Sequence, residues 1–263
     1  MRRRAAPFVV ALVVMLATAA CSSGSDVDTD AESEASEPLR ILVTNDDGVD
    51  AEGIDVLTDA LVALDDVEVT VVAPATNQSA TGSQVSEGEL DVTETETLSG
   101  YPAVAIAGFP ADSVTWALDG GIDVTPALVV SGVNEGQNIG PATLISGTVG
   151  AAHTATAAGI PSLAVSAGIA AEISYDAAVE LAIEWISDHR DALAEGDAPV
   201  ETTSINVPSC PMIKELVDVP VVTETELSIF EVDCDSTLTD PSSDVEGFVN
   251  GYAVISVVPE ATT

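Results

Sequence analysis

The sequence predicts an α/β protein: a doubly wound, mostly parallel sheet followed by a β-rich C-terminal part. Short apolar runs alternate with stretches of helical spacing from about residue 39 to residue 190, and this alternation is typical of doubly wound sheets. The runs are rich in branched side chains, as strands buried on both faces are. With 263 residues and 46% hydrophobic content, the chain is long enough to bury a large core.

The first strand, helix and second strand are predicted between residues 39 and 74. The apolar run 39–44 gives the strand. Apolar side chains then recur at helical spacing, at Ile54, Leu57, Leu61 and Leu64. Residues 67–72 alternate and then turn apolar, which predicts a second strand that ends at Ala73-Pro74. The polar residues 75–87 that follow predict a long loop.

The middle and C-terminal elements follow from shorter patterns. Residues 90–97 alternate acids with Thr and Val, which predicts an exposed edge strand. Pro110 suits a first helical turn, so a helix is expected to begin there. The remaining expectations are the strands 104–106, 127–130, 163–165 and 252–258, and the helices 147–158 and 175–190.

The N-terminal segment has the composition of an export signal. Three arginines at positions 2 to 4 precede the apolar residues 5–20, a run too short for a comfortable membrane span. Thr18-Ala19-Ala20-Cys21 resembles a bacterial lipoprotein processing box, so we predict a signal peptide at residues 1–20 and lipidation of Cys21. Cleavage of an ordinary signal near Ala20 is the alternative. The protein is therefore expected to be exported and lipid-anchored on the outer side of the cytoplasmic membrane, at the bacterial cell surface.

Residues 21–38 are predicted to form a flexible tether, because they are rich in Ser, Asp and Glu. A calcium loop is the other interpretation, since Asp26, Asp28, Asp30 and Glu37 have its spacing. Ala31, however, stands where that loop needs Gly. The folded domain is expected to cover residues 39–263.

The charge of the chain excludes several classes of partner. The full sequence carries a net charge of −38, and removal of residues 1–20 leaves 3 basic against 44 acidic residues, a net of −41. Such a surface repels nucleic acid polymers and anionic membranes, so membrane contact is expected only through the lipid. The mature chain offers only Arg40, Arg190 and Lys214 as cations. A phosphate site would therefore have to recruit positive charge from a metal ion.

Two cysteines remain beyond the export segment, Cys210 and Cys234. Outside the cytoplasm two such cysteines are expected to pair. The sequence therefore predicts a disulfide that staples a hairpin or loop near the C-terminus.

Polar segments follow three of the predicted strands: Asn45-Asp46-Asp47-Gly48, Asn77-Gln78-Ser79 and Ser131-Gly132-Val133-Asn134. Each alone is good turn chemistry. Because the carboxyl ends of parallel strands lie side by side, we expect the three segments to converge. Two carboxylates, a hydroxyl and an amide oxygen favour a hard cation such as Mg, Mn or Ca over Zn.

A fourth segment, Ser146-Gly147-Thr148, opens a predicted helix. Backbone N–H groups at a helix N-terminus bind anions without Lys or Arg. A plain N-cap is the alternative, and the two roles are compatible.

Together these segments resemble the SurE family of survival-protein nucleotidases. The resemblance runs in the family's order from about residue 39 to residue 166 and continues more weakly through 205–208 and 251–252. The segments that carry it are 41–48, 72–79, 108–114, 129–140, 146–152 and 159–166.

The resemblance implies a metal-dependent phosphomonoesterase of the 5′-nucleotidase type that releases phosphate from nucleoside monophosphates. It implies one divalent ion, Mg or Mn, with four ligands: Asp46, Asp47, Ser79 and Asn134. One of the two Asp residues would orient or deprotonate the attacking water. The phosphate pocket would be lined by Asn45, Asn138, Ser146, Gly147 and Thr148.

The chain also departs from the family pattern. Pro141, Ala142 and Ile145 stand where acidic residues and a Tyr are common, and Thr154 replaces a Glu. We expect these changes to affect substrate preference more than metal binding. Family members often use a longer C-terminal part for oligomer contacts, whereas this chain stops shortly after Val258, so a homodimer is left open.

Two further alternatives remain at this level. The protein is a phosphomonoesterase, or it is a non-catalytic surface lipoprotein that binds a nucleotide or phosphate. His153 follows the fourth segment and is interpreted as a helix residue without a catalytic role, the alternative being a general acid to the leaving group.

Overall fold

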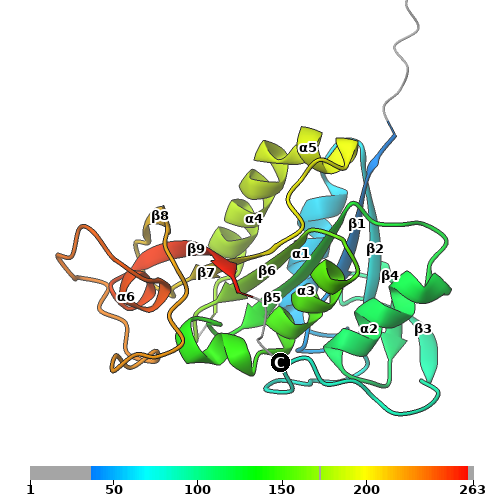
Figure 1. Cartoon of the computed structure of the whole chain (residues 1–263), viewed down its shortest axis with the longest axis horizontal. Coiled ribbons are helices and arrows are strands. Elements are labelled where there is room, and N and C mark those ends of the chain that lie inside the picture. Colours follow the sequence, from blue (N-terminus) through cyan, green and yellow to red (C-terminus); the bar gives the residue numbers. More distant parts are fainter. Residues whose placement is uncertain (1–36, 172, 260–263) are drawn as a thin grey trace, which may run out of the picture. The chain divides into compact units, whose positions relative to one another are not determined.

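The computed structural model describes residues 37–171 and 173–259, and they form an α/β fold around one nine-stranded sheet (Figure 1). The strand order is β3-β4-β2-β1-β5-β6-β7-β9-β8. Strands β4, β2, β1, β5, β6 and β7 run parallel to one another, whereas β3 pairs antiparallel with β4 and β9 pairs antiparallel with β7. The edge strand β8 pairs parallel with β9. The predicted doubly wound, mostly parallel sheet is confirmed. The signal peptide, Cys21 and all but the last two residues of the tether lie outside the described residues.

Strands β1, β5, β6 and β9 agree with apolar runs of the sequence, whereas β3, β7 and β8 are more polar. Their bounds are β1 Leu39–Thr44, β2 Val67–Pro74, β3 Val92–Glu96, β4 Pro102–Ile106, β5 Leu128–Glu135, β6 Ser162–Ala167, β7 Thr202–Val207, β8 Lys214–Asp218 and β9 Tyr252–Val258. β1 lies between β2 and β5, with Ile41 opposite both Val69 and Leu128. The carboxyl ends of β1, β2 and β5 therefore meet at one edge of the sheet.

Helices cover both faces of the sheet. They are α1 Glu52–Val62, α2 Pro110–Trp116, α3 Gly147–Ala157, α4 Asp176–Asp188, α5 Arg190–Glu195 and α6 Asp244–Val249. A five-residue π-helical turn, Ala117–Gly121, extends α2, and a short 3-10 turn, Gly140–Leu144, precedes α3. The expected helix 175–190 is interrupted at His189, between α4 and α5. In the described part of the chain no helix is both long and apolar enough to cross a membrane.

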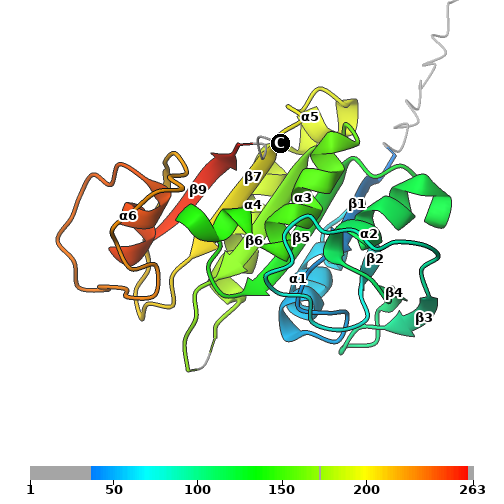
Figure 2. The same ribbon diagram turned by 60° about the horizontal axis from the view of Figure 1, so that its bottom comes forward.

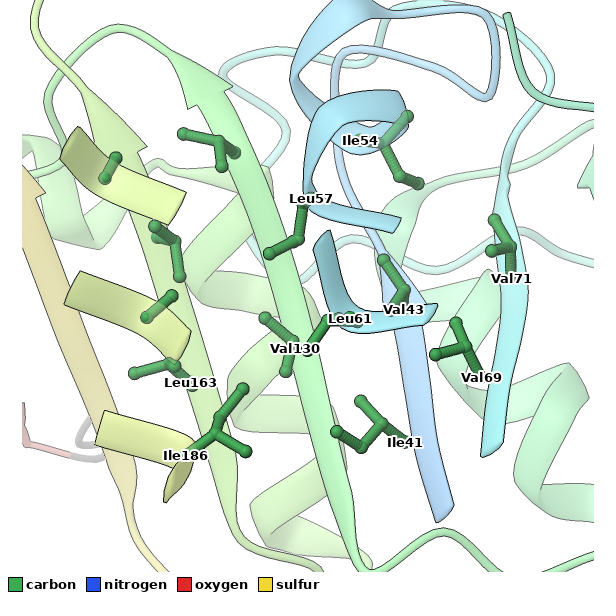
Figure 3. Packing of buried hydrophobic residues seen from close by; sticks show 14 of the residues in the cluster. Ile41, Val43, Ile54, Leu57, Leu61, Val69, Val71, Val130, Leu163 and Ile186 are labelled. Carbon is green, nitrogen blue, oxygen red and sulfur yellow. The ribbon is translucent and has the colours of Figure 1, made fainter. Parts of the chain in front are cut away.

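The alternation of side chains along β1 gives the sheet two separate apolar layers. Ile41 and Val43 pack with α1, α4 and α5 on one face (Figure 3). Leu42 packs on the other face with residues of α2 and α3, the helices that lie in front of the sheet in Figure 2. Burial on both faces explains why this strand reads as a continuous apolar run.

One predicted strand was placed too short. The sequence suggested that residues 127–130 form a strand ending at Ser131-Gly132, but β5 continues to Glu135. After a register shift between Ser131 and Asn134, Asn134 pairs with Ser166 of β6. Gly132 makes this possible, because its φ is +145° and a Cβ there would lie 2.4 Å from the Val165 carbonyl oxygen. Asn134 is thus part of a strand and not of a loop after it.

The C-terminal part is built from β7, β8 and β9 together with long connections and α6. Helix α6 was not expected from the sequence; Ser243 caps it by accepting a hydrogen bond from the Glu246 N–H at 3.2 Å. Val245 and Phe248 of α6 pack with Val254 of β9 in a separate apolar cluster. The structure contains the disulfide between Cys210 and Cys234, which joins the segment after β7 to the connection between β8 and α6.

Candidate functional site

The site begins with a tight turn at the carboxyl end of β1. The Asn45 amide closes this turn, because Nδ2 donates to the Gly48 carbonyl at 2.8 Å and Oδ1 accepts from the Gly48 N–H at 3.2 Å. Gly48 has φ +105°, and a Cβ at this position would lie 3.1 Å from the Thr76 carbonyl carbon. The turn can therefore pack against the loop 75–87 only with glycine at 48.

Asp46 is buried in this turn and faces the N-terminus of α3. Its Oδ1 accepts a 2.6 Å hydrogen bond from the Thr148 hydroxyl. A Cβ at Gly147 would lie 2.7 Å from the Asp46 Cβ, so the helix approaches the carboxylate as closely as glycine allows. Burial raises the pKa of Asp46, and hydrogen bonding from Thr148 opposes that rise.

Asp47 lies next to Asp46 but is less deeply buried, and two groups from other strand ends hold it. Its Oδ2 accepts from the Glu135 backbone N–H at 2.9 Å, and its Oδ1 accepts from Asn77 Nδ2 at 3.1 Å. Burial raises the pKa of Asp47 to about 6; repulsion from Asp46 and Glu135 adds to the rise, and both hydrogen bonds oppose it. An adjacent acid pair with raised pKa values is typical of a cation site.

The other two predicted ligands lie on segments that touch this pair. Ser79 is exposed, on the loop 75–87, and its N–H donates to Asn77 Oδ1 at 3.0 Å. The same loop donates the Gln78 N–H to the Asp46 carbonyl at 2.6 Å. Asn134 directly precedes Glu135, and its Nδ2 donates to the Gly136 carbonyl at 2.6 Å. Its amide oxygen is therefore turned away from that carbonyl.

The predicted phosphate residues divide into two groups. Ser146 caps α3, its Oγ accepting from the Val149 N–H at 3.1 Å, and Gly147 and Thr148 contact Asp46 as described above. Asn138 is held differently: its N–H donates to Asn206 Oδ1 at 2.7 Å and its Nδ2 to Ser166 Oγ at 3.0 Å. The structure thus ties Asn138 to β6 and β7, and its described hydrogen bonds do not reach the aspartates.

Sequence reasoning missed several residues that shape the site. Asn77 was noted only as part of a polar segment, yet it bonds Asp47 directly. Asn206 supports Asn138 from β7, and its position in the weaker family match at 205–208 was the available signal. The Glu135 N–H contact with Asp47 has no sequence signature, because it comes from the backbone.

The three cations of the described chain are all engaged away from the aspartates. Arg40 pairs with Glu68 at 3.3 Å. Arg190 donates to the carbonyls of the turn at residues 65 and 66. Lys214 donates to the Ser236 carbonyl and lies 4.6 Å from the centre of the Tyr252 ring. A phosphate at this site would therefore find its positive charge in a metal ion and in helix N–H groups.

The chemistry of the donors fits a hard divalent ion. In residues 37–171 and 173–259 no group of three or more His, Cys, Asp or Glu side chains is arranged for a metal. The predicted set does not depend on such a group, because it pairs two carboxylates with a hydroxyl and an amide oxygen. Oxygen donors of this kind suit Mg or Mn.

The fold and the site define a class: a doubly wound α/β protein with an acid pair at the carboxyl ends of its central strands, facing a helix N-terminus. Residues 41–228 match the family model described as survival protein SurE. The chain belongs to the SurE family.

Two curated relatives and one solved structure illustrate the similarity. A 5′-nucleotidase SurE of Syntrophobacter fumaroxidans is 40% identical over 174 residues, covering 66% of this chain and 68% of the relative. A 5′-nucleotidase SurE of Dehalococcoides mccartyi is 36% identical over 240 residues, covering 84% and 89%. The crystal structure of the SurE protein from Aquifex aeolicus is 24% identical, with a TM-score of 0.69, and the match covers 85% of this chain and 94% of that chain.

Proposed function

We propose that the protein is a metal-dependent phosphomonoesterase that hydrolyses nucleoside monophosphates. The observation that carries the proposal is the Asp46-Asp47 pair, held against the N-terminus of α3 by the 2.6 Å bond from Thr148. The 5′-nucleotidase names of its relatives support the substrate class.

One divalent ion, Mg or Mn, would be held by oxygens of Asp46, Asp47, Ser79 and Asn134. When bound, such an ion polarises a phosphoryl oxygen and makes a nearby water more acidic. The same ion would offset the free-energy cost of burying two adjacent carboxylates, because a nearby positive charge favours their ionised form.

The residues of the chain would bind and orient the phosphoester. The N-terminus of α3 would offer backbone N–H donors to a phosphoryl group; in the structure the Gly147 and Thr148 N–H groups face Asp46. The amides of Asn45 and Asn138 are the further donors that the family resemblance implies. Asp47 would lie beside the ion, where its carboxylate would orient or deprotonate the attacking water.

Phosphate release from a panel of nucleoside monophosphates, with Mg and with Mn, tests the proposal. Wild type is expected to release phosphate only with a metal present, and Asp46→Asn to lose at least about a hundredfold in kcat/KM, in the range found for loss of a key electrostatic group. Asp65→Asn is the matched control, because Asp65 is exposed and distant from β1's carboxyl end.

The rival function is a non-catalytic lipoprotein that binds a nucleotide or phosphate. It predicts nucleotide-dependent thermal stabilisation without phosphate release under either metal. Wild-type turnover that Asp46→Asn leaves unchanged would contradict the assigned site instead.

We also propose that the protein is exported and anchored on the outer side of the cytoplasmic membrane through a lipidated Cys21. The support is the basic start, the apolar run and the processing box of residues 1–21. Mass spectrometry of the mature N-terminus is expected to show a lipid-modified Cys21. An unmodified cysteine, or cleavage after it, would contradict the anchor.

A further inference from the structure

A cavity of about 410 Å³ lies along one side of α3. Ser146, Gly150 and His153 form its helix wall, because residues three or four apart share one helix face. The opposite wall includes Val221 and Thr223, from the connection after β8, and Val258 of β9. The volume falls within the range of about 300–1,000 Å³ that is common for small-molecule sites.

The cavity and the proposed phosphate site share one residue, Ser146. This residue caps α3 and begins the Ser146-Gly147-Thr148 segment, in which Thr148 bonds Asp46. A ligand with its phosphate at the helix N-terminus would therefore have the cavity beside it.

The lining of this cavity is uncharged apart from the imidazole of His153, and the cavity of about 250 Å³ beside Phe230 has an uncharged lining too. No Asp or Glu is among its described lining residues. By contrast, Glu94 and Glu96 line the cavity of about 940 Å³ beside β3, and Asp112 and Asp119 line that of about 470 Å³ beside α2. A wall without carboxylates suits the neutral part of an otherwise anionic ligand.

The wall also contains residues from the segment in which the sequence departs from its family. Thr143 and Leu144 line the cavity, and they lie within residues 141–145, where the expected acids and Tyr are missing. Leu144 is 61% exposed, so its side chain is available to a ligand. His153 adds a polar edge, with Nδ1 3.3 Å from Thr202 Oγ1.

We propose that this cavity binds the nucleoside half of the phosphomonoester, with Leu144 and His153 as specificity-determining residues. The inference rests on the proposed function and extends it to the leaving group. The competing location is a cavity of about 250 Å³ lined by Gln137, Ile169 and Phe230. That cavity is smaller than the usual range and includes none of the predicted phosphate residues.

Two variants test the location from different walls. Thr223→Trp narrows the cavity from its exposed rim, and Leu144→Glu places a carboxylate in the uncharged wall. Leu227→Trp, on the same connection as Thr223 but outside the lining, is the control for the first. Leu98→Glu, at an equally exposed leucine far along the chain, is the control for the second. Thermal melts show whether each variant remains folded.

The readouts are calorimetric binding of adenosine, guanosine, cytidine and uridine, and KM for the matching monophosphates. We expect both cavity variants to weaken nucleoside binding and raise KM at least about tenfold, or about 1.4 kcal/mol. In the cavity variants, the inhibition constant of inorganic phosphate should stay within about twofold of wild type. In both control variants, nucleoside binding and KM should also stay within about twofold of wild type.

The outcomes separate this inference from the proposed function. If both cavity variants weaken nucleoside binding but wild type releases no phosphate, the cavity is the nucleoside site and the protein is not a phosphomonoesterase. If wild type releases phosphate but the folded cavity variants keep the wild-type KM and nucleoside binding, the cavity is not the nucleoside site, and the proposed enzyme activity is unaffected. If wild type binds none of the four nucleosides, or if Phe230→Ala weakens their binding in place of the cavity variants, the proposed location is wrong.

Discussion

At the scale of single residues, the site depends on how Asp46 is kept in a buried position. A buried carboxylate is costly unless hydrogen bonds or a cation compensate it. In the protein chain the compensation comes from the Thr148 hydroxyl at 2.6 Å, on a helix that begins 101 positions after Asp46. The same hydroxyl thus fixes the geometry of the acid pair and joins α3 to the end of β1.

Replacing Thr148 by Val is therefore expected to destabilise the protein by about 1–3 kcal/mol, because Asp46 loses a partner while staying buried. Urea unfolding in EDTA measures the change in the free energy of unfolding. Thr58→Val is the matched control, because the Thr58 hydroxyl is buried without a hydrogen-bond partner in the described structure. Equal losses in the two variants would show that the Asp46 contact contributes nothing.

The raised pKa of Asp47 predicts how the stability of the metal-free protein depends on pH. Folding raises this pKa from 3.8 to about 6, so the folded protein binds the proton more tightly than the unfolded chain. The contribution is stabilising below about pH 4 and is lost as pH rises through about 6. Across that window wild type should lose at most about 3 kcal/mol relative to Asp47→Asn.

Unfolding of both proteins in EDTA from pH 4 to pH 7 checks this expectation, because their difference removes the contribution of other titrating groups. With Mg present the trend should reverse, since the ion binds the ionised pair. A difference that does not change with pH would mean that Asp47 keeps an ordinary pKa in the fold.

The residues of the candidate site could be proposed from the sequence, but most of their contacts could not. Asp46, Asp47 and Thr148 stand in short segments whose chemistry is legible, and strand ends in a parallel sheet lie together. No sequence pattern indicates that Asn77 and the Glu135 N–H bond Asp47, or that Asn206 bonds Asn138. These contacts join residues that are far apart in the sequence, and local sequence patterns do not predict such tertiary contacts.

At the scale of elements, strands buried on both faces were the most predictable parts. The ends of β1 and β9 agree with the apolar runs, because such strands are marked by composition along their whole length. The end of β5 was misjudged because Ser131-Gly132 is typical of a loop, whereas here Gly132 permits close packing on Val165. Helix α6 escaped prediction because its six residues are too few for a periodic pattern.

The disulfide ties the connection between β8 and α6 to the segment after β7. Cys210 and Cys234 are separated by 24 positions, and a loop of that length corresponds to about 3.5 kcal/mol of chain entropy in the unfolded state. The connection is also held to the segment after β5, since Gln137 Nε2 donates to the Ile229 carbonyl at 2.6 Å.

Reduction of the purified protein is therefore expected to lower its melting temperature. Calorimetry with and without a reductant measures the shift. The double variant Cys210→Ser/Cys234→Ser should melt near the reduced wild type and show no response to the reductant. Identical melting of oxidised and reduced wild type would mean that the bridge does not constrain the unfolded chain.

At the scale of the whole molecule, the excess of acidic residues is the dominant feature. The net charge of −38 places like charges close together over the surface, and their repulsion opposes the compact state. The folded part has only three cationic side chains, so they offset little of this repulsion between carboxylates.

Added NaCl is expected to raise the melting temperature at pH 7, because screening shortens the range of this repulsion from about 30 Å at 0.01 M to about 3 Å at 1 M. The same titration near the isoelectric point of about 4.1 is the control. There fewer carboxylates are ionised, so the rise should be much smaller. An equal rise at both pH values would point to a general salt effect.

The exposed strand β3 has a consequence for the behaviour of the protein in concentrated solution. An open sheet edge is a template on which a second copy can add its own strand. Here that edge presents Glu94 and Glu96 to solvent, so two copies that approach edge to edge meet matching negative charges. Growth into fibrils is opposed at low ionic strength, and the barrier weakens in the same salt that favours the folded chain.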